Sequence, residues 1–212
     1  KCSAASRTYI PRSLWPEVRE RLLFELEKLK VGDPRDFSNF MGAGESGRCI
    51  PRVKGYIDGA QASPDAEVLT GGCDDSVGYF VKPTVILAKT PDYITMKEEI
   101  FGPVLTVYVY GDEDLEEALA LCDSCTAYGL TGAVFAQDRE ALVHMEKALA
   151  HAAGNFYLND KPTGAVVGQQ PFGGSRASGT NDKAGSLLNM IRWTSPRAIK
   201  ENFVPICEIT YP

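Results

Sequence analysis

The residues whose types and spacing suit chemistry fall in short segments that lie far apart in this 212-residue sequence. Lys1-Cys2-Ser3 offers a thiol, and a reactive cysteine can form a covalent intermediate with a carbonyl substrate. Glu99 and Phe101 offer a carboxylate and an aromatic ring just before Gly102-Pro103, a pair that favours a turn. The two segments would supply a nucleophile and a binding group if the fold brings them together.

A third segment runs from Asn159 to Gly174, after an expected buried strand. Ligands of open α/β sheets bind where strands end. Gly164 and Ala165 lack bulk, so their backbone N–H groups can approach an anionic carboxylate directly. The simpler interpretation of this segment is a glycine-rich surface loop in which only Phe172 is buried. The corresponding simpler interpretation of Glu99 and Phe101 is a solvated carboxylate followed by a core aromatic residue.

Taken together, four short runs resemble aldehyde dehydrogenases, most closely the branch that oxidises glutamate semialdehyde, the delta-1-pyrroline-5-carboxylate dehydrogenases. These runs are residues 1–4, 99–103, 163–165 and 170–174. The resemblance extends from Lys1 to about Phe203, and it covers only the C-terminal part of such an enzyme. By resemblance the activity is NAD-dependent oxidation of glutamate γ-semialdehyde to glutamate in proline catabolism.

The resemblance implies a role for each chemical residue. Cys2 is the nucleophile that forms a thiohemiacetal and then a thioester. Glu99 takes the ribose hydroxyls of NAD, and Phe101 packs near the nicotinamide. The small aldehyde substrate is held through its distal carboxylate by Ser3, directly after the nucleophile, and by the backbone of the 164–165 pair.

Phe172, by the same resemblance, lines the aliphatic part of the substrate.

Two departures from the family pattern matter. Residues 41–48 are glycine-rich where the family carries a conventional helix start. The NAD-binding domain, an oxyanion-stabilising asparagine and a water-activating glutamate, all expected upstream of Lys1, are absent from this chain. We therefore expect the isolated chain to be inactive, and the choice between NAD and NADP stays open.

Three other classes of function remain to be weighed. The chain can belong to a general aldehyde dehydrogenase of another branch. It can be a non-catalytic assembly module that keeps the fold. A cysteine hydrolase or acyl transferase is disfavoured because neither His144 nor His151 stands in a motif that pairs with Cys2; both histidines are expected at the surface.

Composition excludes further classes. The net charge is -6, and no Lys/Arg cluster with interleaved aromatics suggests nucleic-acid binding. No apolar run approaches the roughly 18 residues that span a bilayer. The first residues have neither signal-peptide nor transit-peptide character, and by resemblance we expect the mitochondrial matrix in a eukaryote or the cytoplasm in a bacterium. Cys122 and Cys125 have the spacing of a metal or redox pair, but without a second pair we interpret them as structural and predict no metal.

Hydrophobic periodicity predicts alternating strands and helices. Strands are expected at residues 7–10, 67–70, 79–87, 104–110, 130–136 and 155–158, and helices at 13–30, 46–61, after Asp112 or Asp114, at 138–150 with Asp138 as cap, and at 185–191. This order predicts an α/β fold with a parallel sheet covered on both faces.

The end of the chain differs in character. Residues 192–200 read as an extended segment in which Pro196 is tolerated only at a sheet edge. An edge strand leaves backbone groups that another chain can pair with, and in the resembled family a tail at this place joins a neighbouring subunit. We therefore predict a catalytic domain over residues 1–190, an oligomerisation strand and tail over residues 191–212, and a homo-oligomer.

Overall fold

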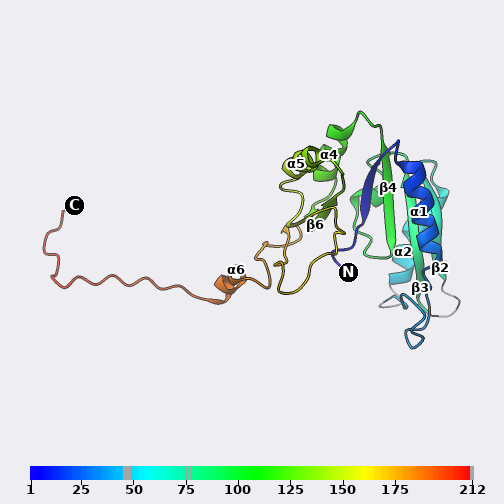
Figure 1. Ribbon diagram of the computed structural model, residues 1–212. Helices are drawn as coiled ribbons and strands as arrows, with labels where there is room; N and C mark the ends of the chain where they lie inside the picture. Colours follow the sequence, from blue (N-terminus) through cyan, green and yellow to red (C-terminus); the bar gives the residue numbers. More distant parts are fainter. Residues whose placement is uncertain (45–48, 75, 77, 211–212) are drawn as a thin grey trace.

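The structure consists of two lobes and an extended C-terminal tail (Figure 1). It is a computed structural model that describes residues 1–44, 49–74, 76 and 78–210. One lobe is built on a four-stranded sheet with helices α1 and α2. The other contains helices α4 and α5 and the shorter strands.

The four-stranded sheet has the order β1-β4-β3-β2. Its strands are β1 (Arg7–Pro11), β2 (Ala66–Asp74), β3 (Phe80–Ala88) and β4 (Val104–Tyr110). The pairs β1/β4 and β3/β4 are parallel as expected, but β2 and β3 are antiparallel. The parallel pairing predicted from strand–helix–strand order does not extend to β2 and β3, because only residues 75–79 separate these strands and a parallel crossover needs a dozen residues or more.

Helices α1 (Trp15–Glu27) and α2 (Cys49–Ala62) cover opposite faces of this sheet. Successive residues of a strand point to opposite faces, so Val85 and Ile86 of β3 enter different cores. Val85 packs with the α1 side, and Ile86 packs with the α2 side, where the buried residues include Val53, Ile57 and Val104. The expectation of a sheet covered on both faces is confirmed. The start predicted for the second helix, Ser46, lies outside the described residues.

The second lobe is organised around a short parallel pair, β6 (Thr131–Val134) and β7 (Asn155–Leu158). Helices α4 (Leu115–Ser124) and α5 (Arg139–Ala148) pack on it through Leu119, Val134, Leu142 and Leu149. A small antiparallel pair joins β5 (Tyr128–Gly129) to β8 (Ser175–Arg176). The α3 turn (Ile94–Lys97) precedes the Glu99 segment in the first lobe.

The predicted helix caps have different outcomes. The Asp138 carboxylate accepts a hydrogen bond of 3.0 Å from the Glu140 N–H group, as an N-cap should. Asp114 occupies the N-cap position of α4, but its side chain makes no capping bond.

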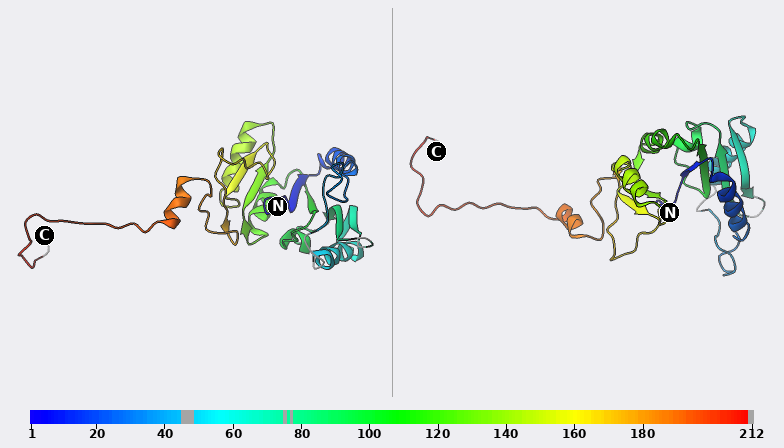
Figure 2. Two further views of the ribbon diagram at one scale, coloured as in Figure 1. Left: turned by 90° about the horizontal axis from the view of Figure 1, so that it is seen from below. Right: turned by 45° about the horizontal axis from the view of Figure 1, so that its top comes forward.

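The end of the chain leaves both lobes (Figures 1 and 2). Helix α6 (Leu187–Met190) is followed by the 3-10 turn η1 (Ile191–Trp193), so Arg192 and Trp193 are not extended as predicted. Residues 194–200 have no regular secondary structure and pair with no strand of the described chain. A tail strand that pairs with another subunit therefore stays a prediction. No helix among the described residues has the length and apolar character needed to cross a membrane.

Candidate functional site

Parallel pairing of β1 with β4 brings the first two chemical segments together. Neighbouring parallel strands begin at the same edge of a sheet, and Cys2 to Ser6 lead into β1 while Glu99 to Pro103 lead into β4. The first residue of β1, Arg7, is the register partner of Thr106, and the Thr106 N–H group donates to the Ser6 carbonyl oxygen at 3.0 Å. Segments some ninety positions apart in sequence thus begin side by side.

The Glu99 carboxylate is held by two donors. The Ser6 hydroxyl donates to Glu99 Oε2 at 2.8 Å, and the Phe101 N–H group donates to Oε1 at 3.0 Å. Phe101 has a φ of +51°, which is unfavourable for a bulky residue and costs about 1–3 kcal/mol in general. The residue as a whole is 54% exposed. The turn therefore presents a fixed carboxylate beside an accessible aromatic ring. Ser6 was not predicted as a site residue, since its only signal in the sequence was its distance of four positions from Cys2.

Gly102 and Pro103 fix the turn to the sheet. A Cβ atom at Gly102 would lie 2.9 Å from Cγ2 of Val53 in α2, so only glycine fits without displacement. The Pro103 carbonyl oxygen accepts a hydrogen bond of 2.8 Å from the Thr84 N–H group of β3. Helix α2 and strand β3 thus position the Glu99 segment from both sides.

Cys2 lies at the surface between the two lobes. The N-terminus occupies this position in every view (Figures 1 and 2). Cys2 is exposed and Ser3 is half-buried. The Thr131 hydroxyl of β6 donates to the Ser3 carbonyl oxygen at 3.2 Å, which ties the Cys2 segment to the second lobe. The same segment therefore contacts the Glu99 turn on one side and β6 on the other.

The loop after β7 is closed by hydrogen bonds of its own. The Gly164 N–H group donates to the Lys161 carbonyl oxygen at 3.0 Å, and Gln170 Nε2 donates to the Gly164 carbonyl oxygen at 3.3 Å. A Cβ atom at Gly164 would lie 2.6 Å from Asp160 Oδ2. The Ala165 N–H group has no partner among the described residues. A carboxylate bound here could accept a hydrogen bond from the Ala165 N–H group. The Gly164 N–H group already donates to the Lys161 carbonyl oxygen.

Phe172 is held on both sides by its backbone. It is half-buried, and its N–H and C=O groups bond to Ala184 at 2.9 and 2.8 Å. The side chain of Asn155, the first residue of β7, contacts the residues before and after it, Pro171 and Gly173. Asn155 is the register partner of Thr131, which contacts Ser3. Strands β6 and β7 thus link Ser3 and Phe172, whereas no hydrogen bond within the described residues joins either of them to Gly164 or Ala165.

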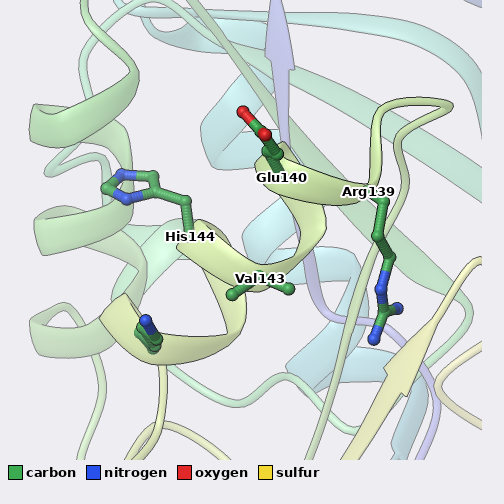
Figure 3. Close-up of a pocket in the computed structure, with 5 residues that line it drawn as sticks. Arg139, Glu140, Val143 and His144 are labelled. Atoms are coloured by element: carbon green, nitrogen blue, oxygen red, sulfur yellow. The ribbon is translucent and has the colours of Figure 1, made fainter.

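A groove of about 310 Å³ lies elsewhere, along one side of α5 (Figure 3). Its lining consists of polar or charged side chains and one valine from a single helix: Arg139, Glu140, Val143, His144 and Lys147. His144 is exposed, as expected, and its Nε2 atom is 2.5 Å from Glu116 Oε1. None of the predicted site residues borders this groove. We assign the site to the segments that meet near Cys2, because one exposed helix face supplies no nucleophile.

The Cys122 and Cys125 pair belongs to the packing of α4. Burial raises the pKa of the Cys122 thiol to about 11. The Cys125 sulfur lies 3.0 Å from the Tyr9 hydroxyl of β1, and burial followed by this hydrogen bond raises the pKa of Tyr9. A thiol with a raised pKa is a poor nucleophile at neutral pH. Within the ranges that the structure describes, no group of three or more His, Cys, Asp or Glu residues is placed to hold a metal ion.

Known proteins match the whole chain. A relative from Dictyostelium discoideum named delta-1-pyrroline-5-carboxylate dehydrogenase, mitochondrial, is 59% identical over 213 residues and the match covers 100% of this chain. A human relative of the same name is 54% identical with the same coverage. The chain spans 38% of the length of each.

Solved structures show the same fold. The delta-pyrroline-5-carboxylate dehydrogenase from Mycobacterium tuberculosis matches with a TM-score of 0.85 and 48% identity, and the match covers 100% of this chain and 39% of that one. The structure of that protein bound with NAD matches with the same TM-score and 49% identity, over 38% of its chain. The sequence profile of the aldehyde dehydrogenase family matches residues 1–198. The family predicted from four short runs is confirmed, and this chain belongs to the aldehyde dehydrogenase family.

Proposed function

We propose that the protein to which this chain belongs oxidises glutamate γ-semialdehyde to glutamate, a step of proline catabolism, with NAD as the hydride acceptor. The observation that carries the proposal is the hydrogen bond of 2.8 Å between Ser6 and Glu99, because it sets the Cys2 segment beside a fixed carboxylate in a member of this family. Relatives that bear the delta-1-pyrroline-5-carboxylate dehydrogenase name support the choice of substrate.

Cys2 acts as the nucleophile. Its thiolate adds to the aldehyde carbon and forms a carbon–sulfur bond, and the carbonyl oxygen becomes the oxyanion of a thiohemiacetal. Loss of hydride from that carbon restores the C=O bond and gives a thioester, which is oxidised by two electrons relative to the aldehyde. Water then cleaves the thioester, releases the carboxylic acid and returns the thiol. The exposure of Cys2 between two lobes supports access by substrate.

Glu99 and Phe101 fit a nicotinamide nucleotide. A carboxylate has about four lone-pair positions, and two on Glu99 are used by Ser6 and Phe101, so acceptor capacity remains for ribose hydroxyls. The exposed Phe101 ring offers a flat apolar surface next to that carboxylate. NAD supplies the hydride acceptor when bound. Structures of relatives with NAD support this choice of cofactor.

Ser3, Gly164, Ala165 and Phe172 form the proposed substrate-binding group. The Ser3 hydroxyl and the Ala165 N–H group supply donors for the distal carboxylate, and Gly164 carries no side chain of its own that could block it. Phe172 contacts the methylene groups between the carboxylate and the aldehyde. The predicted roles of these residues are part of this proposal.

The substrate assignment is tested with two aldehydes of equal length. We expect the full-length protein to use glutamate semialdehyde with a kcat/KM at least about a thousandfold above that for pentanal, because a site built for a polar group rejects analogues without it by up to about 10⁴ to 10⁵. Steady-state kinetics with saturating NAD measures both values. Equal kcat/KM values would favour the second candidate, a general aldehyde dehydrogenase, which the family match by itself also accommodates.

Assembly and location complete the proposal. We propose that residues 1–190 form the catalytic domain and that the exposed tail at 191–212 pairs with another copy in a homo-oligomer. The mitochondrial names of the Dictyostelium and human relatives support the mitochondrial matrix as the site of action in a eukaryotic cell; in a bacterium the corresponding site is the cytoplasm.

A further inference from the structure

The first residues of β6 and β7 form a connection between two parts of the proposed substrate site. Thr131 and Asn155 are register partners, and partners in neighbouring parallel strands project to the same face of the sheet. The Thr131 hydroxyl donates to the Ser3 carbonyl oxygen at 3.2 Å. On the neighbouring strand, Asn155 contacts the segment that contains Phe172. The separation of Ser3 and Phe172 therefore depends on two neighbouring residues, Thr131 in β6 and Asn155 in β7.

Asn155 uses both ends of its amide to hold this segment. It is 7% exposed. Its Nδ2 atom donates to the Pro171 carbonyl oxygen at 2.9 Å, and its Oδ1 atom accepts from the Gly173 N–H group at 3.0 Å. The two bonds bracket Phe172. A buried side chain in this position leaves the Phe172 backbone little freedom, because a lost bond would leave a buried polar group unpaired.

Two neighbouring features strengthen the same arrangement. The Lys183 ammonium group donates to the carbonyl oxygens of Gly154 and Gly173, the latter at 3.2 Å. A Cβ atom at Gly154 would lie 2.0 Å from the Gly173 carbonyl oxygen, so the two backbones approach as closely as only glycine permits. The Phe172 segment therefore packs against the start of β7, at Gly154 and Asn155.

We propose that Thr131 and Asn155 are positioning residues that fix the separation of Ser3 and Phe172 and so set the affinity for the aldehyde substrate. The inference rests on the proposed function for its kinetic consequence, but the contacts themselves are independent of it. Among the described residues, neither side chain hydrogen-bonds to Cys2 or to Glu99 and Phe101, the proposed nucleotide-binding pair. Their loss should therefore affect aldehyde binding selectively.

The kinetic test uses the full-length protein with Thr131→Val, Thr131→Ser and Asn155→Leu. Valine removes the hydroxyl with little change of shape, whereas serine keeps it. We expect Thr131→Val and Asn155→Leu each to raise the KM for glutamate semialdehyde about three- to tenfold or more, the effect of losing a hydrogen bond, with the KM for NAD unchanged. Thr131→Ser should stay near the wild-type value. An unchanged aldehyde KM in Thr131→Val, or an equal rise in the KM for NAD, would overturn the inference.

Hydrogen exchange separates this inference from the proposed function. In Asn155→Leu the amides of residues 172–174 should exchange at least about tenfold faster than in the wild type, while the same amides in Thr131→Val should not change, because Thr131 contacts Ser3 instead. If the wild-type protein fails to oxidise glutamate semialdehyde, the proposed function is wrong, and exchange still tests the contacts. Equal exchange in Asn155→Leu and the wild type would show that Asn155 does not position the Phe172 segment.

Discussion

Glu99 illustrates how neighbouring residues prepare one side chain for binding. Its carboxylate accepts from the Ser6 hydroxyl and from the Phe101 N–H group, so its orientation is set before any ligand arrives. Preorganised groups bind with less loss of conformational freedom. The next carboxylate, that of Glu98, accepts from the Tyr56 hydroxyl and raises the pKa of Tyr56. Two adjacent acidic residues therefore have different partners, and only one faces the Cys2 segment.

This difference gives a matched pair of variants. Glu99→Gln should raise the KM for NAD about 10- to 150-fold, since a hydrogen bond to a charged group is worth about 1.5–3 kcal/mol. The KM for glutamate semialdehyde should change much less, because the proposed partner of Glu99 is the ribose of the cofactor. Glu98→Gln is the control and should leave both constants near wild type. Similar NAD constants for Glu99→Gln and the wild type would remove Glu99 from the nucleotide site.

Local signals in the sequence predicted the elements well. The strands at 104–110 and 155–158 and the cap at Asp138 were confirmed because each depends on neighbouring residues only. The antiparallel β2/β3 pair was missed because the relative direction of two strands depends on the length of the connection between them. Hydrophobic periodicity predicts the strands themselves but carries no information on their direction. The Ser6 to Glu99 contact was missed because it depends on β1 and β4 being neighbours, which no local pattern reveals.

The neighbouring strands β3 and β4 each carry a buried threonine, and the two threonines differ in their hydrogen bonding. The Thr106 hydroxyl of β4 is buried and has no partner within the described residues. The Thr84 hydroxyl of β3 donates to the Lys82 carbonyl oxygen at 2.8 Å and accepts from the Gly72 N–H group at 3.0 Å. Both residues are at most 2% exposed. They have the same shape and burial but opposite states of hydrogen bonding.

Substitution by valine should therefore have opposite effects on stability. Thr106→Val removes an unsatisfied polar group, and we expect it to leave the free energy of unfolding unchanged or to raise it by about 1–2 kcal/mol. Thr84→Val should lower that free energy by about 1–3 kcal/mol because it leaves buried groups unpaired. Urea unfolding of the full-length protein compares the two. Destabilisation of equal size in both variants would contradict the distinction between them.

The molecule as a whole presents apolar surface that its own lobes do not cover. Trp193, Ile199 and Phe203 in the tail are 79%, 78% and 93% exposed. The chain spans 38% of the length of its Dictyostelium and human relatives. Exposed apolar side chains on this scale mark surfaces that meet other protein. Sequence alone indicated the tail as an edge strand, but pairing with a second copy cannot be read from one chain.

We expect residues 1–212, purified alone, to self-associate and to bind no NAD, because the proposed phosphate-binding half of the enzyme is not in this chain. Residues 1–190 should self-associate less, since they lack the apolar tail. Light scattering of both preparations measures association, and a titration with NAD measures binding. A stable monomer of residues 1–212 that binds NAD would show that the proposed domain boundary and the role of the tail are wrong.

We propose that this fold places Cys2 to act as the nucleophile of an NAD-dependent aldehyde oxidation. The most direct measurement is the turnover of glutamate semialdehyde by full-length Cys2→Ala, with Cys122→Ser and Cys125→Ser as controls in the packing of α4. We predict that Cys2→Ala loses at least about 10³-fold in kcat while it still binds NAD, because no covalent intermediate can form. The two controls should remain active. Near-normal turnover by Cys2→Ala would show that Cys2 is not the nucleophile.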